Sequence, residues 1–68
     1  MIVIEIPGAH PRRVGKLRKI LKEERLEFTN MGVGISNVGG CFVHSSTLSK
    51  VSSVLRKHNL KGYRIYEY

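Results

Sequence analysis

The order of two hydrophobic periodicities most strongly limits what these 68 residues can fold into. Ile2, Ile4 and Ile6 alternate with other residues, which is the period-two pattern of a half-buried strand. Two later segments, 11–25 and 48–59, instead place apolar side chains three and four residues apart, the pattern of an amphipathic helix. Short strand-like segments lie before, between and after these two helices. The sequence therefore predicts six elements in the order strand, helix, strand, strand, helix, strand.

Residues at the ends of both predicted helices support this assignment. Pro11 suits the first turn of a helix, where its missing N–H costs nothing. Residues 45–47 offer three hydroxyl groups that can cap the N-terminus of the second helix. Arg56 and Lys57 suit the negative end of the dipole of that helix.

The remaining strands are predicted over 26–35, 41–44 and 62–68. Residues 36–40 are predicted to form a turn, since Asn and Gly tolerate positive φ angles. This element order with short connections favours an α+β, ferredoxin-like βαββαβ fold, in which two helices cover one face of a four-stranded antiparallel sheet. Residues 1–68 are expected to form a single domain. Because that fold hosts many unrelated functions, function has to be inferred from particular side chains.

An excess of positive charge is the clearest functional feature of the sequence. Twelve Lys and Arg residues stand against five acidic residues, a formal net charge of +7. Such a balance favours acidic partners, namely nucleic acid, an anionic membrane surface or an acidic protein. No apolar run approaches the roughly 20 residues that span a bilayer, so we expect no membrane insertion. The N-terminus lacks the features of a signal peptide and the single Cys suits a reducing compartment, so we expect a cytoplasmic protein.

The first predicted helix carries the densest group of cations. Seven of the twelve basic residues fall between Arg12 and Arg25, and several lie opposite the apolar stripe of the helix. We expect five of these side chains to bind phosphates or another anion: Arg12, Arg13, Lys16, Lys19 and Lys22. The alternative is an ordinary solvated helix face, in which Lys19 and Glu23 form a weak ion pair.

The second candidate surface is the face of the sheet that the helices leave open. If Ile4, Cys41 and Ile65 point toward the helices, the alternating side chains of the same strands point away from them. The side chains then expected on the open face are Phe42, His44, Arg64, Tyr66 and Tyr68. Aromatic rings beside a cation stack on unpaired bases, and each stacked base contributes about 1–3 kcal/mol. Alternatively, Tyr63, Tyr66 and Tyr68 cover a sheet edge or a homodimer contact through the sheet face or edge, where Tyr is favoured.

The third predicted strand resembles the RNA-recognition motif, a family that has the same element order and binds RNA on its sheet. Gly39, Phe42 and Val43 match the third-strand signature of that family. The signature has one basic and two aromatic residues at positions that this chain fills differently: Val38, Gly40 and Ser45. The first predicted strand supplies no aromatic residue. What the resemblance implies is therefore limited to a platform on which bases stack.

Patterns for catalysis and metal binding are weak. Cys41 has His44 nearby but no group that would orient a base, so Cys41 is expected to be a small core residue. Arg12 or Arg13 together with Asn30 resembles the arginine and asparagine of acylphosphatases, which implies a small acyl- or phosphate-processing hydrolase. The glycine-rich loop of that family is not matched. One Cys and three separated His predict no metal site, and no cofactor is expected.

These features favour a small nucleic-acid-binding module, with RNA or a single strand as the preferred ligand. In this hypothesis the first helix contacts phosphates and the aromatic residues of the sheet contact bases. The alternative is a small protein-interaction module or inhibitor that binds an acidic or nucleic-acid-processing protein. Enzymatic activity is not expected, because no set of convergent catalytic groups is present in the sequence.

Overall fold

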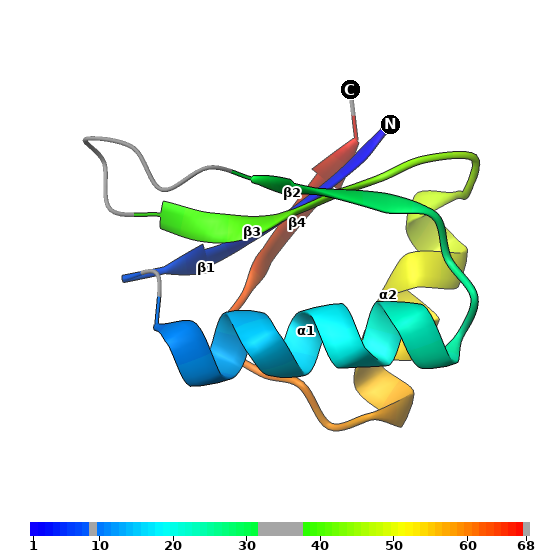
Figure 1. Ribbon diagram of the computed structural model, residues 1–68. Coiled ribbons are helices and arrows are strands. Elements are labelled where there is room, and N and C mark those ends of the chain that lie inside the picture. The colour runs from blue at the N-terminus through cyan, green and yellow to red at the C-terminus, as the bar shows by residue number, and fades with distance from the viewer. Residues whose placement is uncertain (9, 32–37, 68) are drawn as a thin grey trace.

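A computed structural model describes residues 1–8, 10–31 and 38–67 of the chain (Figure 1). The predicted element order is confirmed, with these bounds: β1 (Ile2–Pro7), α1 (Pro11–Glu23), β2 (Phe28–Met31), β3 (Val38–Val43), α2 (Leu48–Lys57) and β4 (Arg64–Glu67). Tyr68 and residues 32–37, where the sequence predicts the end of the second strand and part of a turn, lie outside the described residues.

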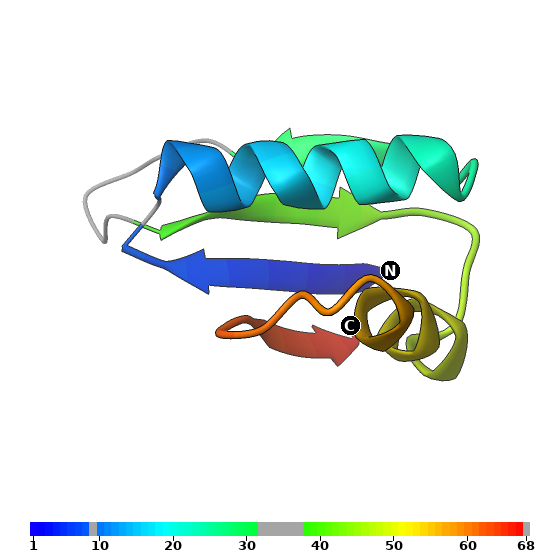
Figure 2. The ribbon, with the colours of Figure 1, turned by 90° about the horizontal axis from the view of Figure 1, so that it is seen from below.

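The four strands form one antiparallel sheet in the order β2-β3-β1-β4. Both helices lie on the same side of this sheet, and the other side is open (Figures 1 and 2). Figure 2 shows α1 running along β3 and β2, while α2 lies near β4 at the other edge. The molecule therefore has two layers, which we call the helix side and the open face.

Side chains along β1 point alternately to the two faces of the sheet, and those that point to the helix side form the centre of the core. Ile2, Ile4 and Ile6 point toward the helices and have no exposed surface. The helices contribute the facing side chains of this core: Leu17, Ile20 and Leu21 from α1, and Val51, Val54 and Leu55 from α2. Burial of each Leu or Ile contributes about 1.5–3 kcal/mol, so this layer contact is the main source of stability.

Both helices end in a Schellman motif, which stops each of them two residues before its predicted end. Arg25 and Asn59 adopt left-handed φ angles of 57° and 58°. The residue after each of them is a buried leucine, Leu26 or Leu60, whose N–H donates to the carbonyl five residues earlier. Burying that leucine beside the last turn favours ending the helix over extending it.

The third strand begins earlier than predicted, at Val38 instead of Cys41. The sequence assigned Gly39 and Gly40 to a turn, but both pair with β1. Gly40 has a φ of 154°, and a Cβ atom there would lie 1.9 Å from the carbonyl oxygen of Ile4. Glycine is therefore needed here for close approach of two strands, a role that sequence composition does not separate from a turn.

Candidate functional site

Charged side chains are divided very unequally between the two layers. We define the helix layer as residues 11–25 and 48–61, which hold eleven of the twelve Lys and Arg residues and two of the five carboxylates, a balance of +9. The rest of the chain has one such cation, Arg64, and three carboxylates, a balance of −2: Glu5, Glu27 and Glu67. The net charge of the protein therefore resides on one side of the fold.

The outer side of α1 is the densest part of this charged layer. Four of the five predicted anion-binding residues of α1 are exposed there: Arg12, Lys16, Lys19 and Lys22. None of them forms an ion pair with a residue that the structure describes, and the ion pair predicted between Lys19 and Glu23 is not formed. At 1.5 Å per residue these cations extend over about 15 Å of helix. Their charge is therefore available to a ligand.

Arg13 makes a contact that the sequence did not reveal. Its Nη2 atom donates a hydrogen bond to the carbonyl oxygen of Lys61, 48 residues further along the chain. The guanidinium also covers Gly62, which has a left-handed φ of 72°. Arg13 therefore connects the start of α1 to the loop before β4, while its charge still belongs to the helix layer.

The open face carries the second predicted group of residues. Strand pairing places Thr29, Phe42, Val3 and Tyr66 in one row across the sheet. Val3 points away from the helices but is only 1% exposed, because Phe42 and Tyr66 flank it on the neighbouring strands. His44 lies at the end of this face, with its Nε2 atom 2.7 Å from the hydroxyl of Thr29. Part of the ring surface predicted to bind bases is thus used to cover Val3.

Among the four described strands, Arg64 is the one basic residue, and it pairs in register with Glu5 of β1. A carboxylate on the adjacent strand offsets the positive potential that a phosphate would need there. Tyr66 is 37% exposed, which leaves about a third of its surface for a ligand. Tyr68, also predicted for this platform, lies outside the described residues.

The fold places the two predicted surfaces on opposite sides of the molecule. The cations of α1 are exposed on the helix side, where α1 runs along β3 and β2 (Figure 2). Phe42 and Tyr66 instead pair in register with Val3, whose side chain points to the open face. The shortest dimension of the domain is 17 Å. A single ligand that contacts α1 and stacks on the sheet must therefore pass around an edge of the domain.

Sequence analysis missed a cluster that joins the C-terminal ends of the two helices. The Oε2 atom of Glu24 accepts hydrogen bonds from His58 Nε2 at 2.8 Å and from Lys57 Nζ at 3.3 Å. These two hydrogen bonds lower the pKa of Glu24 below its ordinary value of 4.5, and the bond from His58 has the larger effect. These partners are more than 30 residues apart, so no local spacing in the sequence indicates the cluster.

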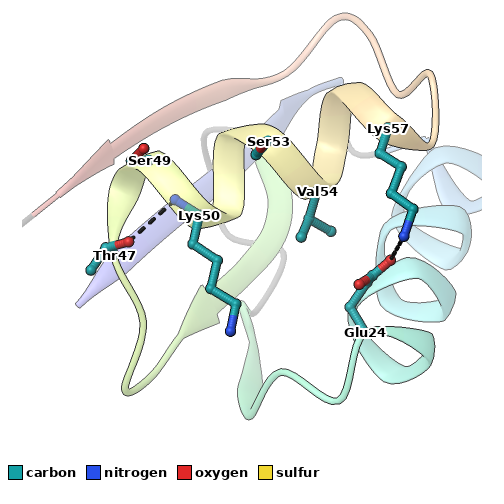
Figure 3. Close-up of a pocket in the computed structure, with 7 residues that line it drawn as sticks. All are labelled: Glu24, Thr47, Ser49, Lys50, Ser53, Val54 and Lys57. Atoms are coloured by element: carbon teal, nitrogen blue, oxygen red, sulfur yellow. Dashed lines mark hydrogen bonds and ion pairs between the residues drawn. The ribbon is translucent and has the colours of Figure 1, made fainter.

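A surface hollow of about 450 Å³ lies beside this cluster, along the outer side of α2 (Figure 3). It belongs to the helix layer, and its lining is mostly hydroxyl and charged groups: Glu24, Thr47, Ser49, Lys50, Ser53, Val54 and Lys57. None of these residues was singled out as a ligand-binding residue from the sequence. Six of these residues come from α2 and its N-cap, and Glu24 comes from the C-terminal end of α1.

The environment of Cys41 assigns this residue to the core. Its side chain has no exposed surface, and its Sγ atom donates to Asn30 Oδ1 at 3.8 Å. Burial raises the pKa of the Cys41 thiol to about 11, although the charge of Arg18 acts in the opposite direction. The thiol is therefore protonated at neutral pH and is a poor nucleophile.

The described residues also bear on metal binding, on the acylphosphatase resemblance and on membrane insertion. Within residues 1–8, 10–31 and 38–67, no group of three His, Cys, Asp or Glu side chains is arranged to hold a metal ion. In this part of the chain Arg13 donates to the carbonyl of Lys61 and Asn30 accepts from the Cys41 thiol, and neither Arg12 nor Arg13 forms a hydrogen bond with Asn30. No helix among the described residues has the length and apolar character that crossing a membrane requires.

The chain matches no protein-family model, no curated protein and no solved structure. Its function is therefore inferred from its own charges and contacts.

Proposed function

We propose that this chain is a nucleic-acid-binding module that contacts the phosphate backbone with its helix layer. The observation that carries this proposal is the division of charge, +9 on the helix layer against −2 on the rest of the chain. Cations grouped in this way attract a polyanion, and binding is driven by release of the counterions that surround it. Solubility alone does not require this arrangement, because a mixed-sign surface is equally soluble.

The stripe on α1 supplies the principal contacts. Arg12, Lys16 and Lys19 are exposed and have no ion-pair partner among the described residues, so binding does not require breaking an existing ion pair. Each phosphate contact adds about 0.9 to the salt slope with duplex DNA and about 0.7 with a single strand. The number of contacts can therefore be measured directly.

RNA or a single strand is the preferred ligand in this proposal. The support is the partly exposed ring of Tyr66 beside Phe42, which offers a stacking surface to a strand that passes around the sheet edge. The element order and the strand order β2-β3-β1-β4 further support classifying the domain as ferredoxin-like. The buried, unpaired thiol of Cys41 supports a cytoplasmic location.

A protein-interaction module is the second candidate. The observation that favours it is the open face, where Met1 and Tyr66 are exposed around the buried side chain of Val3. Amphipathic rings in such a position are common at protein contacts, including homodimers. An acidic protein partner would instead use the helix layer, and the dependence of affinity on salt separates it from a nucleic acid.

The proposal is tested with the triple variant Arg12→Gln, Lys16→Gln and Lys19→Gln. Binding to single-stranded RNA, single-stranded DNA and duplex DNA is measured by fluorescence anisotropy over a series of salt concentrations. Loss of three phosphate contacts should lower the salt slope for a single strand by about 2 and weaken binding strongly. Circular dichroism should be unchanged, because all three side chains are exposed.

Two single variants provide the controls. Lys19→Gln and Arg64→Gln each remove one cation, but only Lys19 belongs to the helix layer, so only Lys19→Gln should lower the slope. Tyr66→Ala should weaken single-strand binding without changing the slope if the sheet contributes to the same complex. Equal affinity of the triple variant and the natural protein would refute the proposal.

A further inference from the structure

We infer that the hollow beside α2 is a phosphate-binding subsite of the helix layer. The inference rests on the proposed function, because it assigns one phosphate contact to a defined place within the surface that binds the polyanion. It extends the contact region from the stripe on α1 to the second helix.

The geometry of α2 places a cation at each end of the hollow. Lys50, Val54 and Lys57 are spaced by four and then three residues, so they share one side of the helix. Figure 3 shows Lys50 and Lys57 on either side of Val54, with Lys57 directed to Glu24 at the end of α1. Val54 is 8% exposed and forms an apolar floor between the two ammonium groups.

Hydrogen-bond donors without partners line the same hollow. The hydroxyls of Ser49 and Ser53 and the ammonium of Lys50 have no hydrogen-bond or ion-pair partner in the described part of the chain. Thr47 differs, because its hydroxyl accepts a hydrogen bond from the backbone N–H of Lys50. Ammonium and hydroxyl donors suit the acceptor oxygens of a phosphate group. The volume of about 450 Å³ lies within the usual range of small-ligand sites, about 300–1,000 Å³.

The carboxylate in the lining does not oppose an anion, because it is already paired. Glu24 accepts from both His58 and Lys57, and its charge is offset by the Lys57 ammonium. The side chain of Lys57 remains 70% exposed in this pair, so its other N–H groups are accessible to a second acceptor. With Lys50 included, the lining has a net positive charge.

The direct test is an NMR titration of the full ¹⁵N-labelled chain with inorganic phosphate, with sodium chloride of equal ionic strength as the reference. We expect saturable shifts of the backbone amides of residues 49–53 with phosphate and none with chloride. Lys50→Gln should weaken this binding by about tenfold, the usual loss for a charged hydrogen bond. Arg56→Gln is the matched control, since Arg56 is an exposed cation of the same helix that does not line the hollow.

A second arm separates the two sources of a phosphate group. Oligonucleotides with and without a 5′-phosphate are titrated into the same sample. Stronger perturbation of residues 49–53 by the phosphorylated end would assign the subsite to a terminal monoester, and equal perturbation would assign it to the diester backbone. Either result supports the subsite, whereas no perturbation of these residues by any of the three probes would overturn it.

The failure of this inference differs from the failure of the proposed function. If the α1 triple variant loses oligonucleotide binding while Lys50→Gln and Arg56→Gln behave alike, the subsite is refuted and the proposed function stands. If no oligonucleotide binds but inorganic phosphate still shifts residues 49–53 in a Lys50-dependent manner, the proposed function fails and the hollow remains a phosphate site.

Discussion

The helix side and the open face of the sheet use the same strands but differ in what covers them. Ile4 points to the helix side, where side chains of both helices exclude water from it. Val3, the preceding residue, points to the open face and is buried almost as completely, but by neighbouring side chains of the sheet such as Phe42 and Tyr66. Ile4 and Val3 are therefore almost equally buried, but Ile4 lies between the sheet and the helices, whereas Val3 is covered only by neighbouring side chains of the sheet.

The two sides also differ in charge, and this difference is more informative about function. Packing requires only that the outer side of each helix be polar, and it does not choose the sign of the charge. The helix layer nevertheless has a balance of +9, whereas the rest of the chain has −2. Stability does not require this imbalance, and the polyanion ligand that we propose would account for it.

The largest expected effect tests whether a side chain covered by the helices contributes more to stability than one covered only by its neighbours on the sheet. Ile4→Ala should lower the free energy of unfolding by about 2–5 kcal/mol, because it leaves a cavity under both helices. Val3→Ala should cost less, about 1.6 kcal/mol for two methylene equivalents, since the open face can relax into solvent. Urea unfolding followed by circular dichroism measures both. Equal losses would show that the open face is packed as firmly as the core.

A smaller effect, of opposite sign, is expected on the outer side of α1. A Cβ atom built at Gly15 has no atom within 4 Å, so alanine fits there without contact. Gly15→Ala should therefore raise the free energy of unfolding by about 0.5–1 kcal/mol and leave nucleic-acid binding unchanged. Gly62→Ala is the contrasting variant, because a φ of 72° is strained for alanine and the added methyl group would displace the Arg13 guanidinium. Destabilisation by Gly15→Ala would contradict this description of the helix face.

The smallest effect concerns the cluster that joins the helix ends. Glu24 has a lowered pKa in the folded protein, so its contribution to stability is present above its ordinary pKa of 4.5 and is lost as pH falls through the folded value. Glu24→Gln should therefore lower stability at neutral pH, and this difference from the natural protein should shrink below about pH 4.5. The control is Glu23→Gln, at an exposed residue without an ion-pair partner among the described residues. A stability difference that does not change with pH would show that the ionised carboxylate of Glu24 does not stabilise the fold.

Local features of the fold could be predicted where one residue has one dominant structural use. Thr47 caps α2 and accepts a hydrogen bond from the N–H of Lys50, as the hydroxyl-rich segment before that helix indicated. The prediction of a turn at Gly39 and Gly40 was wrong, because glycine occurs both in turns and where two strands approach closely. The helix ends were also missed, since Arg25 occupies a left-handed position that usually holds glycine.

The sequence alone determined the order of the elements, the inward side of each helix and the excess of positive charge, because each depends on composition or on spacings of a few residues. Tertiary structure alone decided that the α1 cations and the Phe42–Tyr66 row lie on opposite sides, and that Glu24 contacts His58. It also decided that Glu24, at the end of α1, lines the hollow beside α2. These properties depend on how elements that are distant in the sequence pack against one sheet, and no local spacing contains that information.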